Sequence, residues 1–119
     1  MRVLIVDDEP QMVDVCSDVI SSINFGEIKI IVDTDTTPNG AAEKIRSQHY
    51  SLVMLDLKMP GMNGMDLLRL VKKYNSEAVV VIITGYPTIE SAVEAIKTGA
   101  YDYLAKPFHW EELSARIRA

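Results

Sequence analysis

The chain has 119 residues, 48% of them hydrophobic, and its 17 acidic and 12 basic side chains give a formal net charge of −5. This length and apolar content suit one packed domain and exclude wholesale disorder. The acidic balance argues against direct nucleic-acid binding, which needs clustered Lys and Arg. The apolar run before Asp7 is too short for a signal peptide or a membrane span. We therefore expect a cytoplasmic protein without membrane contact.

The first predicted unit is a strand followed by a helix. The continuous apolar run at 3–6 is typical of a strand covered on both faces. Pro10 suits the first turn of the next helix, where apolar residues recur at helical spacing until Gly26. Cys16 is one of these apolar residues. As the only cysteine it rules out an internal disulfide and a multi-cysteine metal site, and we interpret it as a buried structural thiol.

Two similar units follow. Residues 29–32 form a second apolar run, and the Pro-Asn-Gly sequence at 38–40 predicts a loop before a short helix at 41–45. Residues 51–57 predict a third strand. Strong turn signals at 59–64 end this strand, and a helix with its own apolar stripe comes after them.

The fourth unit has the most uniform strand. Residues 78–83 are almost all Val and Ile, which favours a buried strand. Pro87 opens the helix that follows, and Ile89, Val93 and Ile96 lie on one face of it. A glycine then closes this helix.

A fifth strand is predicted at 101–105, and a last helix begins at Trp110. Strand-helix alternation with β-branched strands predicts an α/β fold, in which helices cover both faces of an open, parallel, doubly wound sheet of five strands. No linker divides residues 1–119, so we expect a single domain. The sequence stops about two turns into the last helix, which we interpret as the point where a longer protein continues.

Polar residues stand where the predicted strands end. They are Asp7 and Asp8 after the first strand, Asp56 near the end of the third, Thr84 ending the fourth and Lys106 following the fifth. In open α/β sheets, ligands bind at the carboxyl ends of the strands. We therefore expect these five side chains to meet at one edge of the sheet.

Such a group of side chains predicts a metal ion and an anion together. Three neighbouring carboxylates repel one another, by roughly 4 kcal/mol for a pair ~4 Å apart at an effective dielectric of ~20, unless a cation or a proton is bound. Oxygen ligands without His or Cys favour Mg²⁺ or Mn²⁺. An ammonium and a hydroxyl facing the same site indicate an anion, such as a phosphoryl oxygen, bridged to the metal. Phosphoryl transfer depends on such positioning and charge neutralisation.

Each of these residues has a structural alternative. Asp7 and Asp8 are also suited to capping the first helix, and Asp56 to a cap or turn. Thr84-Gly85 and Lys106-Pro107 are ordinary strand exits when each is taken alone. Their joint occurrence on successive strand ends favours the functional interpretation.

Four segments resemble the two-component response regulator receiver domain, a CheY-like family. They are VLIVDDEP, LVMLDLKMPGMNG, VVVIITGYPTIESAVEAIKTGA and YDYLAKPF. The segment at 85–108 is most similar to receivers of NtrC-like regulators. The resemblance implies a flavodoxin-like, doubly wound sheet with strand order 2-1-3-4-5. Two departures, the spacing within 33–43 and Ser51 in place of a frequent Asp, lie away from the expected site.

The resemblance also implies roles for the polar residues. Asp56 would be the phosphoacceptor, Asp8 would bind Mg²⁺ directly, and Asp7 would bind it largely through water. The backbone carbonyl of Lys58 would complete the protein ligands, and Lys106 would pair with the phosphoryl group.

Further positions resemble the switch machinery of the family. Thr84 would donate its hydroxyl to a phosphoryl oxygen, and Tyr103 would be the aromatic residue that turns inward when Thr84 moves, although Tyr103 also suits plain packing. Lys58 and Tyr86 occupy positions that tune phosphoryl hydrolysis. The bond between Lys106 and Pro107 resembles the cis peptide of the family.

The implied partners are a sensor histidine kinase, which donates the phosphoryl group, and an output domain, which the receiver controls through changed protein contacts and which is expected to be transcriptional. Those contacts, or a homodimer, would use the face formed by the helix after Pro87, the strand at 101–105 and the last helix. The chain would not be an enzyme in the usual sense, because it phosphorylates and dephosphorylates itself. Two rival functions are a binding module that is never phosphorylated and a haloacid-dehalogenase-type phosphatase, although the length leaves no room for the cap insertion of the latter.

Overall fold

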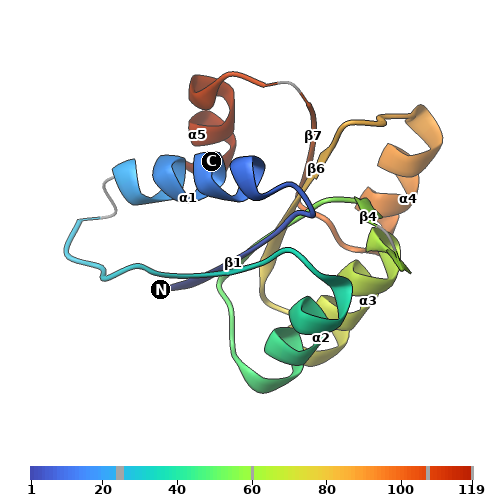
Figure 1. Ribbon diagram of the computed structural model, residues 1–119, viewed down its shortest axis with the longest axis horizontal. Helices are drawn as coiled ribbons and strands as arrows, with labels where there is room; N and C mark the ends of the chain where they lie inside the picture. Colours follow the sequence, from blue (N-terminus) through green and yellow to red (C-terminus); the bar gives the residue numbers. More distant parts are fainter. Residues whose placement is uncertain (24–25, 60, 107, 119) are drawn as a thin grey trace.

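A computed structural model describes residues 1–23, 26–59, 61–106 and 108–118 (Figure 1). Strands and helices alternate along most of the chain. Their bounds are β1 Arg2–Val6, α1 Pro10–Ser22, β2 Ile31–Asp35, α2 Pro38–Ser47, β3 Leu52–Leu55, β4 Lys58–Met59, β5 Met62–Asn63, α3 Gly64–Tyr74, β6 Val79–Thr84, α4 Ile89–Thr98, β7 Asp102–Ala105 and α5 Trp110–Arg118.

The main sheet has five parallel strands in the order β2-β1-β3-β6-β7. This order confirms the predicted topology, in which the chain starts near the middle of the sheet and reverses direction after β2. Helices α1 and α5 cover one face, and α2, α3 and α4 cover the other (Figure 1). The short strands β4 and β5 form an antiparallel hairpin where turns were predicted.

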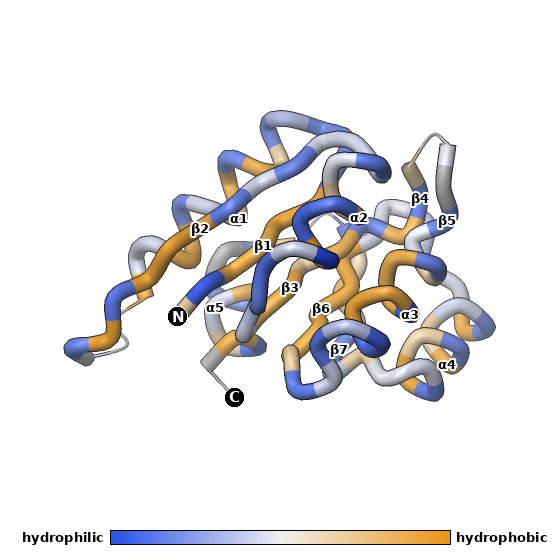
Figure 2. The backbone as a smooth tube through the Cα atoms, turned by 90° about the horizontal axis from the view of Figure 1, so that it is seen from below, coloured by the Kyte–Doolittle hydropathy of each residue, from blue (hydrophilic) through white to orange (hydrophobic). Residues whose placement is uncertain are grey.

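Two apolar clusters fill the space between the sheet and its helices. Along β1, Val3 and Ile5 pack with α1 and α5, while Leu4 and Val6 pack with α2 and α3. Strands covered in this way must be apolar at every position, which explains the continuous runs in the sequence (Figure 2). Cys16 lies in the first of these clusters, and burial raises the pKa of its thiol to about 12, as expected for a structural residue.

The second strand and second helix differ from the prediction. Strand β2 begins at Ile31 and runs to Asp35, because it pairs with all of β1, from Arg2 to Val6. Helix α2 begins at Pro38 where a loop was predicted. The side chain of Thr37 accepts a hydrogen bond from the Gly40 N–H and caps the helix, and Pro is well suited to its first turn. A Cβ at Gly40 would collide with the Asp35 carboxylate, so that side chain would have to move.

Smaller differences occur at other ends. Helix α4 begins at Ile89 with Thr88 as its N-cap, so Pro87 precedes the helix. Strand β3 ends at Leu55, directly before Asp56. Helix α5 begins at Trp110 as predicted. Among the described residues, none of the helices has the length and apolar content needed to cross a membrane.

Candidate functional site

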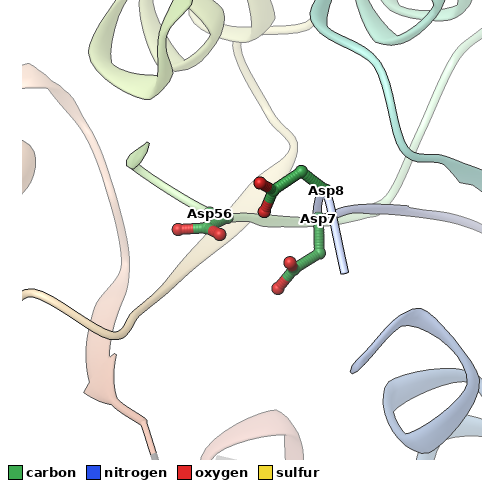
Figure 3. Close-up of side chains that lie close together, drawn as sticks. All are labelled: Asp7, Asp8 and Asp56. Carbon is green, nitrogen blue, oxygen red and sulfur yellow. The ribbon is translucent and has the colours of Figure 1, made fainter. Parts of the chain in front are cut away.

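Three carboxylates gather at the carboxyl ends of β1 and β3. The Asp56 N–H donates to the Val6 carbonyl oxygen at 3.0 Å, which continues the pairing of the two strands and sets Asp7 beside Asp56. One oxygen each of Asp7, Asp8 and Asp56 lies within 4.8 Å of the others (Figure 3). Asp7 and Asp56 are buried, whereas Asp8 is exposed. The structure thus brings together the three acids that the sequence predicted would meet.

Lys106 supplies the positive charge at this site. It follows β7, and its N–H donates to the Thr84 carbonyl oxygen at 2.7 Å. Its Nζ lies 2.6 Å from Asp7 Oδ2, 3.1 Å from Glu9 Oε1 and 3.3 Å from Asp56 Oδ2. Although burial works in the opposite direction, hydrogen bonding to Asp7 and the charges of Asp56 and Asp7 raise the pKa of Lys106 above its ordinary value. The ammonium therefore stays charged.

The carboxyl of Asp56 has a raised pKa and therefore ionises less readily than an exposed aspartate. Burial raises the pKa of its carboxyl from 3.8 to about 6, and the negative charge of Asp7 adds to this effect. The Lys58 N–H and the Lys106 ammonium act in the opposite direction without cancelling the rise. A cation bound among these carboxylates would favour the ionised form. The donor set, three carboxylates without His or Cys, fits a hard cation such as Mg²⁺.

The segment after Asp56 fixes the orientation of its carboxylate. The Lys58 N–H donates to Asp56 Oδ1 at 3.1 Å, while Oδ2 faces Lys106. The β4-β5 hairpin then folds back against the site. A Cβ at Gly64 would lie 2.5 Å from the Asp56 carbonyl oxygen and 2.5 Å from Leu57 Cα. Only glycine permits this close approach.

Thr84 lies at the same edge of the sheet. It is fully buried at the end of β6, and its Oγ1 accepts a hydrogen bond from the Tyr86 N–H at 3.1 Å. The Tyr86 ring is exposed, and Lys58 Nζ lies 5.2 Å from the ring centroid. Lys58 and Tyr86 thus link the hairpin to the segment between β6 and α4.

Tyr103 lies one step further from the acids. Its half-buried ring packs against the cluster beneath α3 and α4. Its hydroxyl is hydrogen bonded to Ser91 Oγ at 2.6 Å and accepts a bond from the Thr88 N–H at 3.4 Å. The structure therefore connects Tyr103 to the first turn of α4.

A cavity of about 770 Å³ opens over the acids. Asp8, Asp56 and Lys106 line its floor, and Lys58 and Tyr86 are among the residues of its wall. The cavity is large enough to admit a phosphoryl group together with hydrated ions. The predicted cis bond before Pro107 lies outside the described residues.

Sequence reasoning missed Glu9 and Ser91. Glu9 shares Lys106 with Asp7 and Asp56 because Asp7 Oδ1 accepts a bond from the Glu9 N–H at 3.0 Å and so turns the chain toward the site. Its place directly after two site acids was the available signal. Ser91 was a polar residue in the first turn of a predicted helix, which also suits a cap.

The family model of the response regulator receiver domain matches residues 3–118. The chain therefore belongs to this family and is the receiver domain of a two-component response regulator, a signal-transduction protein. This confirms the resemblance seen in the sequence.

Known proteins support the same assignment. The chain is 35% identical over 119 residues to the transcriptional regulatory protein QseB of Escherichia coli O157:H7, covering 100% of this chain and 52% of that protein. It is 34% identical over 113 residues to the nitrogen assimilation regulatory protein NtrX of Azorhizobium caulinodans, covering 93% of this chain and 24% of that protein. The chain thus spans about half, or less, of the length of these relatives.

Solved structures share the fold. The beryllofluoride-activated NtrC4 receiver domain dimer has a TM-score of 0.85 and 34% identity, with 98% of this chain and 93% of that chain covered. The BeF3-activated DrrB receiver domain has a TM-score of 0.86 and 26% identity, with 98% and 93% covered.

Proposed function

We propose that this domain is a phosphorylation-controlled switch whose phosphoacceptor is Asp56. The observation that carries the proposal is the position of Asp56 beside two further acids and Lys106 on the floor of an open cavity. A phosphohistidine of a sensor histidine kinase is the proposed donor. An Asp56 oxygen attacks phosphorus, the bond from phosphorus to the histidine nitrogen breaks, and the histidine leaves with the electron pair of that bond.

The chain's own residues prepare this transfer. The Lys58 N–H holds one Asp56 oxygen and leaves the other facing Lys106. The Lys106 ammonium, already within 3.3 Å of Asp56 Oδ2, is placed to pair with an oxygen of the incoming phosphoryl group. Positioning and charge neutralisation of this kind account for most of the catalysis in phosphoryl transfer.

Asp7, Asp8, Asp56 and the backbone carbonyl of Lys58 are the proposed ligands of Mg²⁺, with Mn²⁺ as an alternative. The oxygen donors and the raised pKa of Asp56 support this assignment. When bound, the ion would neutralise charge on the carboxylates and on the phosphoryl oxygens. Asp7 already has Lys106 at 2.6 Å, so its contact to the ion is proposed to run through water.

The new charge on Asp56 is proposed to act on Thr84 and Tyr103. If the Thr84 hydroxyl donates to a phosphoryl oxygen, the segment from Thr84 to Tyr86 shifts and the bonds of Tyr103 to the start of α4 rearrange. The face formed by α4, β7 and α5 would then change its contacts. This face would control an attached output domain, and residues 1–119 would be the N-terminal receiver of a longer cytoplasmic transcriptional regulator.

Acetyl phosphate labelling tests the phosphoacceptor. With Mg²⁺ present, we expect the chain to gain one phosphoryl group by intact mass, and we expect EDTA to prevent the gain. Asp56→Asn removes the acceptor and should abolish labelling. Asp18→Asn is the matched control, because Asp18 is an exposed acid on α1. Labelling that persists in Asp56→Asn would place the acceptor elsewhere.

A further inference from the structure

Strand β2 forms one edge of the main sheet and exposes apolar residues there. Among the described strands it pairs with β1 alone. The segment that leads into β2 runs past the N terminus at the margin of the molecule (Figure 2). Ile28 is 57% exposed and Ile31 is 42% exposed. We refer to residues 28–34 as the β2 arm. An exposed apolar edge strand can add a strand of another chain to its sheet.

The β2 arm has a row of backbone groups directed away from β1. The Ile31 N–H donates to the Met1 carbonyl oxygen at 2.9 Å. Four residues later, the Asp35 carbonyl oxygen accepts from the Asp7 N–H at 3.2 Å. The odd positions therefore bond to β1. Because backbone groups alternate in direction along a strand, those of the even positions point outward and can bond to another strand. The even positions are Ile28, Ile30, Val32 and Thr34.

Opposite charges lie at equal distances from the middle of the β2 arm. Lys29 and Asp33 are each two residues from Ile31, so the three side chains share one face of the sheet. Lys29 is exposed and has no ion-pair partner among the described residues. Arg2 Nε and the Tyr50 hydroxyl both donate to Oδ2 of Asp33, at 3.0 Å and 2.7 Å. Within the described chain, Asp33 Oδ1 therefore remains available for another cation.

We propose that the β2 arm pairs antiparallel with the β2 arm of a second copy of this chain, which joins the two sheets into one. A two-fold axis at Ile31 sets the two Ile31 side chains next to each other. The same axis places Lys29 of each copy opposite Asp33 of the other, so two reciprocal ion pairs form. The outward backbone groups of the even positions then face one another, as an antiparallel ladder requires.

The neighbouring registers match the charges less well. An axis at Ile30 would set Lys29 opposite Ile31 and leave the ammonium unpaired. An axis at Val32 would set Lys29 opposite Asp35, whose two carboxylate oxygens already accept bonds from within the chain. Charge complementarity therefore selects the axis at Ile31.

Proline substitution tests the hydrogen bonds between the two arms. Sedimentation equilibrium of the full chain in EDTA, at concentrations up to about 1 mM, gives the dissociation constant. Thr34 is exposed and its N–H points outward, so Thr34→Pro should keep the pairing with β1 and weaken association about tenfold. Thr34→Val keeps the N–H and is the matched control, which should stay within about twofold of the parent. Circular dichroism confirms that each variant is folded.

Charge reversal tests the ion pairs. Lys29→Gln should weaken association about threefold and Lys29→Glu about tenfold, because two symmetric attractions are first removed and then reversed. Lys73→Glu makes the same change of net charge at an exposed position of α3 and should leave the dissociation constant unchanged. Equal effects of Lys29→Glu and Lys73→Glu would show that net charge alone controls association and would overturn the proposed pairing.

Cysteine cross-linking tests the position of the axis. Opposite residues at a non-hydrogen-bonded antiparallel site have Cα atoms ~4.5 Å apart, within the range of a disulfide. Ile31→Cys should therefore cross-link with itself on oxidation. Ile28→Cys is the control, because Ile28 is more exposed but would lie roughly 20 Å from its counterpart. Equally efficient cross-linking of both variants would overturn the proposal. Cys16 is buried and should not contribute to the background.

The outcomes separate this inference from the proposed function. The pairing goes beyond that function, because it forms without a phosphodonor and without Mg²⁺. A chain that stays monomeric up to about 1 mM, or a Thr34→Pro variant that associates as tightly as the parent, would overturn the pairing even if Asp56 is labelled normally. Absence of labelling, with the pattern of the Thr34 and Lys29 variants intact, would instead overturn the proposed function alone.

Discussion

Asp56 is an ionisable group in a place where its charge is costly. The residue is 4% exposed, and the pKa of its carboxyl is raised to about 6. We predict that Asp56→Asn stabilises the protein by about 1–2 kcal/mol at pH 7.5 without Mg²⁺, because it removes a buried charge while Lys106 keeps Asp7 and Glu9. Urea unfolding in EDTA measures this difference.

The pH dependence of the same variant follows from the direction of the pKa shift. The folded-state pKa of Asp56 lies above its ordinary value of 3.8, so between about pH 4 and 6 the native state binds more protons than the unfolded state. The contribution of Asp56 to the free energy of unfolding therefore falls as pH rises through this window. The advantage of Asp56→Asn should be largest above pH 6 and shrink toward pH 4. An advantage independent of pH would contradict the assignment.

Gly64 gives a second prediction at the scale of the residue. A Cβ there would meet the backbone of Asp56 and Leu57 at 2.5 Å, and backbone cannot move aside as a flexible side chain can. Gly64→Ala should lower the free energy of unfolding by about 1–3 kcal/mol and slow Asp56 labelling, because the acceptor is displaced. At Gly85 the nearest atom to an added Cβ is Lys106 Cδ at 3.9 Å. Gly85→Ala should therefore leave stability nearly unchanged.

The site acids could be predicted from the sequence because they are charged residues at the ends of apolar strands. An Asp after a buried strand is costly unless it has a function, and the rule for strand ends placed Asp7, Asp8, Asp56 and Lys106 together. Glu9 could not be found in this way. Its contact with Lys106 depends on the turn that Asp7 makes with the Glu9 N–H, and on a side-chain direction that no periodicity encodes.

At the scale of the element, α4 is held by polar contacts more than by burial. Ser91 Oγ accepts from the Thr88 N–H and is hydrogen bonded to the Tyr103 hydroxyl. Ser91→Ala should cost about 1 kcal/mol of stability and speed hydrogen exchange at the first turn of α4. Thr98→Ala, which removes a bond to the Glu94 carbonyl oxygen at the other end of the helix, is the control and should not affect that turn.

A second variant shows whether Ser91 acts through Tyr103. Tyr103→Phe removes the same hydrogen bond from the other side, so the double variant should cost less than the sum of the single variants. Ser91→Thr keeps the hydroxyl and should restore slow exchange. Additive effects would mean that Ser91 only caps the helix.

The order and type of the elements followed from periodicity, whereas some of their ends did not. The start of α2 was mistaken for a loop because Pro38 and Gly40 are turn residues in most contexts. Here Thr37 caps the helix, and Gly40 leaves room for the Asp35 carboxylate beside the first turn. Periodicity also grouped Ile89 with Val93 on one face of α4, but it could not tell that this face would be exposed.

At the scale of the whole molecule, the sheet places the acids and α4 at opposite ends of one short chain of contacts. Asp56 pairs with Lys106, and the Lys106 N–H bonds to the Thr84 carbonyl. The Thr84 hydroxyl holds the Tyr86 N–H just before α4, and Tyr103 reaches the same helix from β7. Each link is a hydrogen bond or an ion pair, so a shift at the acids has a direct structural route to α4.

Because Thr84 lies on this route, its substitution should leave beryllofluoride binding at Asp56 intact but abolish the response of α4. With beryllofluoride and Mg²⁺, we expect amide NMR signals to shift near Asp56 and along α4 in the parent. Thr84→Ala should keep the shifts near Asp56, because the acids and Lys106 are intact, and lose those of α4, because the hydroxyl that holds the Tyr86 N–H is gone. Thr84→Ser keeps the hydroxyl and should retain both sets. If α4 still responded in Thr84→Ala, the signal would have to travel by another path, such as the pairing of Lys58 with Tyr86 across the cavity.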